Sequence, residues 1–169
     1  DITNLAPGNY NLLVTDANGC TFALGPLTVT QPLQITIGSD STRDVSCNGG
    51  NDGAIYISVS GGTLPYSFSW TGPGLFSSAN EDITNLSAGN YNLSLTDGNG
   101  CIRTFGPVTI TQPGWLTVSI DYINHVSCFG ANNGSIGVTA SGGTPPYSYL
   151  WTGPGSYNTT SEDISTLSP

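Results

Sequence analysis

The chain has 169 residues, of which 37% are hydrophobic and only 8% are charged, and its formal net charge is −9. It contains no lysine, and its two arginines, Arg43 and Arg103, stand against eleven carboxylates. Nucleic-acid binding needs a basic patch, and an anionic membrane surface attracts basic residues, so this composition argues against both partners. No stretch reaches the roughly 18 apolar residues of a transmembrane helix, and membrane insertion is not expected.

The sequence repeats itself with an offset of 81 residues, since the segment 1–5 returns at 82–86 and 82 − 1 = 81. The same offset holds without a gap through the pairs Cys20/Cys101, Pro32/Pro113, Cys47/Cys128 and Trp70/Trp151. A strict period of this size indicates an array of one structural unit. We expect a piece of a longer protein in three parts: the C-terminal part of one repeat at 1–32, a complete repeat at 33–113 and the N-terminal part of the next at 114–169.

Within 33–113, alternation of apolar and polar residues predicts short strands and almost no helix. In chain order, strands are expected at 35–37, at 55–59 after a glycine-rich turn, and at 66–70. A less regular stretch runs to residue 83, and a hairpin then joins strands at 91–95 and 105–110. About seven short strands with regularly spaced turns are typical of a sandwich. The fold class is therefore expected to be all-β, built of tandem Ig-like or PKD-like β-sandwich repeats.

Aromatic residues fit such a sandwich at two places in each repeat. Leu86-x-x-Gly89-x-Tyr91 has the form of a tyrosine corner, in which the hydroxyl of Tyr91 bonds to the preceding backbone, and Tyr10 repeats the pattern. Trp70 and Trp151 stand on the third strand, where Ig-like domains bury a tryptophan. They could instead stack on sugars, but their neighbours on the same face are aromatic, which favours a place in the core.

The combination of motifs resembles the SprB repeat of Bacteroidetes surface proteins. The likeness rests on a set of short segments that covers the whole chain: Val45-Ser46-Cys47-x-Gly49, Ser60-Gly61-Gly62-Thr63-x-Pro65-Tyr66-Ser67-x-x-Trp70, Thr96-Asp97-x-Asn99-Gly100-Cys101, Thr111-Gln112-Pro113, and Gly142-Gly143-Thr144-Pro145-Pro146-Tyr147-Ser148 in the next copy. The departures are mild, with Leu64 in place of a proline and Asn133 in place of a common acid.

This resemblance implies a very large adhesin of gliding motility or a relative of one. Such a protein would be exported by type IX secretion, displayed outside the cell on the outer membrane and driven along it by the gliding machinery. Its partners would be neighbouring repeats of the same chain and a substratum such as surface polysaccharide.

Two cysteines occur in each period, one before the second strand and one after the late hairpin turn. Outside the cytoplasm such thiols are expected to oxidise. Pairing within a repeat would join Cys47 to Cys101, whereas pairing across junctions would join Cys20 to Cys47 and Cys101 to Cys128. The first turn and the last hairpin of a Greek key lie at opposite ends of the sandwich, which counts against Cys47–Cys101. The candidate disulfides, together with reduced thiols or more distant pairing, therefore stay open.

Residues suited to catalysis are few. The single histidine, His125, is replaced by Asp44 one period earlier, and a catalytic base would not be expected to vanish from the neighbouring copy. The adjacent acids Glu81-Asp82 and Glu162-Asp163 point in opposite directions on an extended chain and cannot face each other across a cleft. The turn 48–53 carries oxygens that suit calcium but does not match an EF-hand loop. We expect no catalytic, cofactor-binding or metal-binding residues, with calcium as a weak possibility, and a chain that is not an enzyme.

The expected function is mechanical, since arrays of whole domains provide reach and spacing. Repeats joined through a short Gln-Pro linker would form a filament, a structural segment of a cell-surface adhesin. One alternative is a carbohydrate-binding module repeated for avidity. Another is a set of spacer domains in a large secreted hydrolase.

Overall fold

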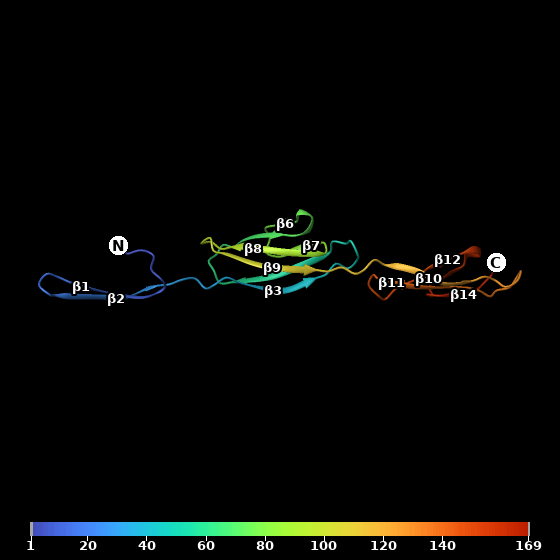
Figure 1. Cartoon of the computed structure of the whole chain (residues 1–169), viewed down its shortest axis with the longest axis horizontal. Helices are drawn as coiled ribbons and strands as arrows, with labels where there is room; N and C mark the ends of the chain where they lie inside the picture. The colour runs from blue at the N-terminus through green and yellow to red at the C-terminus, as the bar shows by residue number, and fades with distance from the viewer. Residues whose placement is uncertain (1, 169) are drawn as a thin grey trace.

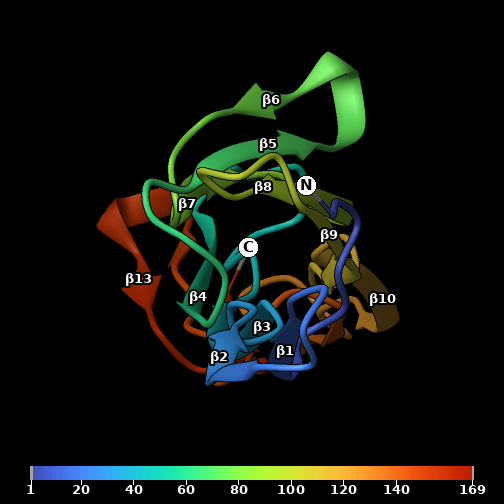
Figure 2. The same ribbon diagram turned by 90° about the vertical axis from the view of Figure 1, so that its left-hand side faces the viewer.

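The computed structural model describes residues 2–168, and these residues form antiparallel strands in three groups along an elongated molecule (Figure 1). Seen along its long axis, the groups project onto one another (Figure 2). The expected all-β class is confirmed, and the only helical pieces among these residues are two short 3-10 turns, Pro73–Leu75 and Pro154–Ser156. Neither is long and apolar enough to cross a bilayer.

The central group is a sandwich of seven strands. One sheet has the order β3-β4-β7 and the other β6-β5-β8-β9. The strands are β3 (Thr36–Arg43), β4 (Gly53–Ser60), β5 (Ser67–Thr71), β6 (Ser77–Ser78), β7 (Ile83–Leu86), β8 (Gly89–Thr96) and β9 (Ile102–Ile110). All the pairings are antiparallel, as expected for an Ig-like sandwich.

The core lies between the two sheets and follows the alternation in the sequence. Ile55 and Ile57 point inward from β4, and Leu93 and Leu95 point inward from β8, all of them buried. Trp70, only 1% exposed, lies at the centre of the core. Its indole nitrogen donates to the backbone oxygens of Asn80 and Glu81, at 3.1 and 3.3 Å, which satisfies the one polar atom of its side chain.

The start of β8 is fixed by the tyrosine at the corner of the sandwich. The hydroxyl of Tyr91 donates to the carbonyl oxygen of Ser87, four residues upstream, at 2.9 Å. Its ring packs edge-to-face against Phe76, with centroids 5.3 Å apart. A Cβ on Gly72 would lie only 2.5 Å from the ring, so Gly72 leaves the space that Tyr91 occupies.

The first group is a single hairpin of β1 (Gly8–Thr15) and β2 (Thr21–Val29). It repeats the β8–β9 hairpin at the 81-residue offset, including a register shift after the tyrosine, between Tyr10 and Leu12 in one and Tyr91 and Leu93 in the other. The hydroxyl of Tyr10 donates to the carbonyl oxygen of Ala6 at 2.6 Å, which is the same corner geometry.

The third group repeats the strands that precede β8. It contains the sheet β10-β11-β14 and the pair β12-β13. The bounds are β10 (Thr117–Asn124), β11 (Gly134–Ser141), β12 (Trp151–Thr152), β13 (Asn158–Thr159) and β14 (Ile164–Leu167). Trp151 is half-buried here, whereas its equivalent Trp70 is fully buried, because no strands equivalent to β8 and β9 cover it among residues 114–168.

The strand boundaries differ from expectation mainly in the first strand of the repeat. The alternation predicts this strand at 35–37, but β3 extends to Arg43 because a bulge between Ser39 and Ser41 lets a polar segment continue the pairing with β4. Ile35 lies just before this strand and still reaches the core. Polar residues outside the alternating pattern carry no periodic signal, so the extension could not be read from the sequence.

Candidate functional site at the repeat junctions

The loop between β3 and β4 ties the end of the central sandwich to the linker that follows it. Asn48 donates from its side-chain amide to the carbonyl oxygen of Pro113 at 2.9 Å, and the backbone N–H of Gly49 donates to Oε1 of Gln112 at 2.9 Å. Asp44 accepts from the N–H of Thr111 at 2.7 Å. The Gln-Pro linker is therefore held against the domain that it leaves, rather than swinging free.

The same loop also contacts the third group of strands. The hydroxyl of Thr144 donates to the carbonyl oxygen of Ser46 at 3.3 Å. Cys47 and Trp115 line a hollow of about 360 Å³ that opens between the two bodies. Within the third group, Gly143 donates its N–H to the carbonyl oxygen of Gly114 at 2.9 Å, which holds the segment after the linker beside the segment that meets Ser46.

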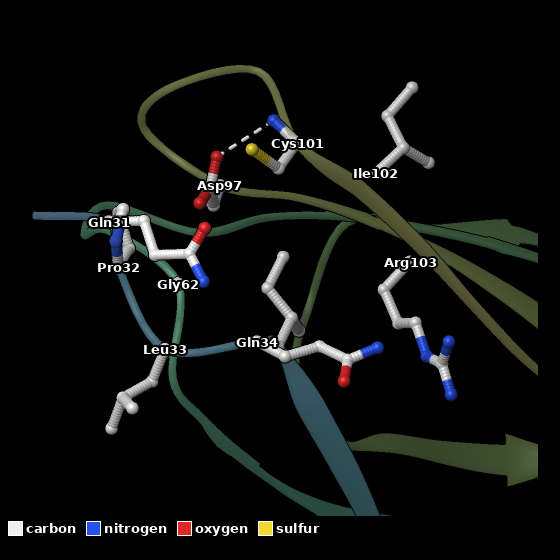
Figure 3. A pocket seen from close by; sticks show the side chains of 10 residues that line it. Gln31, Pro32, Leu33, Gln34, Gly62, Asp97, Cys101, Ile102 and Arg103 are labelled. Atoms are coloured by element: carbon white, nitrogen blue, oxygen red, sulfur yellow. Dashed lines mark hydrogen bonds between the residues drawn. The ribbon is translucent and has the colours of Figure 1, made fainter. Parts of the chain in front are cut away.

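The opposite end of the central sandwich is built around the turn between β8 and β9. Asp97, which is buried, accepts hydrogen bonds from the N–H groups of Thr63, Asn99 and Cys101, at 3.0, 2.9 and 2.8 Å. Figure 3 shows the last of these, together with the thiol of Cys101 beside the linker residues Gln31 and Pro32. These residues line a hollow of about 420 Å³ at the entrance to the repeat.

The two hollows are incomplete versions of one junction. Four residues that line the entrance hollow are Leu33, Gln34, Ile35 and Gly62, and their equivalents one period later are Gly114, Trp115, Leu116 and Gly143. The first hollow includes the late hairpin turn but no β3–β4 loop of a preceding copy. The second includes that loop but no late hairpin. A junction between two complete repeats would bring both elements to the same linker.

The cysteines lie at these junctions. All four belong to the described residues, and all are exposed and free. Cys47 and Cys101 are not brought together, because one lies at the exit and the other at the entrance of the central sandwich. The alternative pairs Cys20–Cys47 and Cys101–Cys128 are also apart within one chain, since the turns that hold Cys20 and Cys128 point to the two far ends of the molecule (Figure 1).

The other polar residues that suggest chemistry have structural roles or lie exposed. His125 is exposed in the β10–β11 loop. Asp82 accepts from the N–H of Ile57 at 3.0 Å, and Asp163 does the same for Val138, so one acid of each adjacent pair joins two strands. Glu162 accepts from the hydroxyl of Tyr149 at 2.8 Å, and this hydrogen bond raises the pKa of Tyr149 to about 12.

The oxygens of the turn 48–53 that suggested calcium are used within the protein. Asp52 accepts from the N–H of Ser46 at 3.0 Å, and this bond lowers the pKa of the Asp52 carboxyl. Asn48 faces the linker through its amide. Across residues 2–168, no three histidine, cysteine, aspartate or glutamate side chains gather as metal ligands would.

Acid is expected to weaken the ends of the sandwich first. The N–H of Cys101 lowers the pKa of Asp97, and hydrogen bonds from Thr111 lower that of Asp44, from the usual 3.8. A carboxyl whose pKa is depressed by folding contributes stability that is complete above its unfolded pKa and is lost as the pH falls through its folded pKa. Urea midpoints should therefore be constant from pH 7 to about 5 and fall below about 4.

The variant Asp97→Asn shows how much of this pH dependence of stability comes from the Asp97 carboxyl. It should be less stable than the wild type at pH 7, and the difference should shrink as the pH falls through the lowered pKa of the wild-type carboxyl, which then also becomes neutral. Equal differences above and below that pKa would show that the charge of Asp97 does not stabilise the turn.

Comparison with known proteins identifies the repeat. The model of the family described as "SprB repeat" matches twice, at residues 39–75 and 123–156. No curated protein matches the chain. Among solved structures, the chain is similar to the three N-terminal domains of the bacteriophage RB49 highly immunogenic outer capsid protein (Hoc), with 16% identity and a TM-score of 0.46. That similarity covers 80% of this chain and 49% of the other, so the chain spans about half the length of that structure. The two matches each contain a β3–β4 type loop and the Gly-Gly-Thr segment of the junction, and they support membership in the SprB-repeat family.

Proposed function

We propose that the chain is a segment of the shaft of a long cell-surface adhesin that serves gliding motility and attachment. SprB repeats belong to surface adhesin-like proteins, and an extracellular location accords with this. Export by type IX secretion, attachment to the outer membrane and movement by the gliding machinery are the finer parts of the proposal. The chain contributes length and stiffness, and no catalysis.

The observation that carries the proposal is the way the linker is held. Asn48, Gly49 and Asp44 all bond to the segment 111–113, and Thr144 bonds back from the next body. A linker fixed on both sides transmits orientation from one repeat to the next. Many copies joined in this way would form a rod, whereas free linkers would give a coil that collapses on itself.

The composition of the surface suits a shaft. With two cations and eleven carboxylates in 169 residues, neighbouring rods repel one another weakly and offer no basic patch to polyanions. Selected surfaces, or other parts of the protein, would then bind the substratum.

A repeated sugar-binding module is the less favoured function. It would present an exposed aromatic residue at the same place in each copy. Trp115 is 74% exposed beside the junction, but Gln34 occupies its position in the complete repeat. Binding of the chain to a glycan array, lost on Trp115→Ala, would favour this alternative over a passive shaft.

The adhesin role can be tested on cells that produce the protein. An antibody against residues 33–113 should label intact cells, and the label should disappear in cells that lack type IX secretion. Deletion of the gene should reduce attachment and spreading on a surface. Labelling only after the cells are permeabilised, or normal spreading after deletion, would contradict the proposal.

The stiffness of the junction can be tested in solution. Asn48→Ala removes one hydrogen bond to the linker, at a cost of about 1 kcal/mol to the free energy of unfolding. In small-angle scattering, the variant should also show a broader distribution of end-to-end distances. The range of angles over which the intensity follows that of a rod should become narrower. Asn51→Ala, an exposed asparagine of the same loop, is the matched control and should change neither measurement. If the wild type already scatters as a flexible chain, the rod is refuted.

A further inference from the structure

The first and last strands of the central sandwich run side by side in the same direction, although they belong to different sheets. β3 and β9 each lie at the edge of their own sheet. At the entrance, Ile35 before β3 and Ile102 at the start of β9 line the same hollow. At the exit, Thr111 after β9 is hydrogen-bonded to the segment that follows β3. The two strands are therefore parallel and are neighbours at both ends.

Four hydrogen bonds join residues 44–49 to residues 111–113, and we call this set the exit clamp. Thr111 uses both of its backbone groups, since its N–H donates to Oδ1 of Asp44 at 2.7 Å and its carbonyl oxygen accepts from the N–H of Val45 at 2.9 Å. The other two bonds run from the β3–β4 loop to the linker, at 2.9 Å each. The hydrogen bond from Thr111 lowers the pKa of Asp44, so this carboxylate is charged at neutral pH and makes the stronger kind of hydrogen bond.

Tension along the chain would load the exit clamp along the direction of the strands. The chain enters the sandwich at the start of β3 and leaves it at the end of β9. These strands follow the long axis of the molecule (Figure 1). Pulling would therefore draw β3 toward the entrance and the end of β9 toward the exit. Hydrogen bonds between strands lie across that direction, so the bonds of the clamp resist together instead of opening one after another.

We propose that the exit clamp, centred on Asp44 and Thr111, sets the tension at which the repeat unfolds. The proposal deepens the proposed function and rests on it, because a shaft must carry tension, but the geometry lies within one repeat. Within residues 33–113, no strand of one sheet pairs with a strand of the other. Without the clamp, the load would have to pass from β3 through β4, the apolar core and β8 before it reached β9.

Apolar packing supports the exit clamp on its inner side. Val45 is 3% exposed and Ile110 is 1% exposed, so the residues beside the hydrogen bonds are buried. A Cβ on Gly53, the first residue of β4, would lie 2.9 Å from the side chain of Ile110 and 3.2 Å from the backbone oxygen of Arg43. The ends of β3 and β9 therefore meet at the start of β4. Slippage of β9 toward the exit would draw Ile110 out of the core and expose apolar surface to water, in addition to breaking the hydrogen bonds.

Force spectroscopy on the 169-residue chain, held by its two ends, tests the exit clamp. Unfolding of residues 33–113 releases about 280 Å of extended chain, less the folded length, which identifies the step. At constant force, Asp44→Ala should raise the rate of this step about tenfold, because a hydrogen bond to a charged acceptor no longer has to be broken. Asp44→Asn keeps an oxygen acceptor without the charge, and its rate should lie between those of the wild type and Asp44→Ala.

Asp82→Ala is the matched control. Asp82 is also an exposed carboxylate that accepts one backbone N–H, from Ile57 at 3.0 Å. That bond lies between β4 and the start of β7 and stays intact while the exit clamp opens, so its loss should change the rate under force less than about twofold. In urea, without force, the two alanine variants should shift the unfolding midpoint by similar amounts. The difference between the two variants should therefore arise under load.

Three results would overturn the role of the exit clamp. They are an unchanged forced unfolding rate in Asp44→Ala, an equal rise in Asp82→Ala, and a rate in Asp44→Asn no lower than in Asp44→Ala. Each of them would leave the cell-surface role standing, because antibody labelling and the spreading of cells measure that role separately. Conversely, a protein that is not displayed on the cell surface could still show the predicted order of unfolding rates.

Discussion

Replacement of Trp70 by alanine is expected to unfold most of the central sandwich at neutral pH. Loss of a buried tryptophan costs about 3–5 kcal/mol, and small domains have only about 5–15 kcal/mol of stability in all. The side chain is 1% exposed, and its indole donates to two backbone oxygens of the segment that leads into β7. Alanine would leave a cavity between the sheets and two carbonyl groups without their donor.

Urea unfolding, followed by near-ultraviolet circular dichroism and tryptophan fluorescence, measures this effect. Trp115→Ala is the matched control, because that side chain is exposed beside the junction and should cost less than about 0.5 kcal/mol. The loss of stability in Trp151→Ala should lie between the losses in the other two variants, since the side chain of Trp151 is only half-buried. Equal losses in all three variants would show that the core does not depend on the position of Trp70.

The central sandwich could be predicted from the sequence because its strands are short and alternate strictly. Ile55 and Ile57 on one sheet, and Leu93 and Leu95 on the other, mark their inner faces by period alone. The same pattern predicts a core tryptophan at Trp70 and a corner tyrosine at Tyr91, and both side chains are buried. The local alternation of apolar and polar residues therefore predicts most of the fold of one repeat.

The junction could be predicted only in part. The Gln-Pro linker was expected to be short, but its bonds to Asn48 and Gly49 join residues more than 60 positions apart, and nothing in the local pattern signals them. The contact between Thr144 and Ser46 depends on how two bodies are oriented, which periodicity does not encode. The cysteines show the same limit, because spacing along the chain does not reveal that Cys47 lies at the exit and Cys101 at the entrance of a repeat.

Substitution of Gly61 by alanine is expected to damage both the sandwich and its entrance junction. Gly61 has φ +75°, and a Cβ there would lie 2.1 Å from the carbonyl oxygen of Gln34. The left-handed conformation costs alanine about 1–2 kcal/mol, and displacement of the packed segment adds about 1–3 kcal/mol. Since Gly62 donates its N–H to the carbonyl oxygen of Leu33 at 2.7 Å, the displacement would also break the bond that holds the linker to this turn.

A second glycine separates the two costs. Gly100 has φ +80°, but a Cβ there would meet nothing within 4 Å, so Gly100→Ala should carry only the conformational cost of about 1–2 kcal/mol. The excess loss in Gly61→Ala over Gly100→Ala, measured by urea unfolding, then reports the close approach to Gln34. The same contact recurs one period later, where a Cβ on Gly142 would lie 1.9 Å from the carbonyl oxygen of Trp115. If Gly61→Ala and Gly100→Ala lose equal stability, the segment after the linker is free to move, and a repeat could not pass its orientation to the next through this contact.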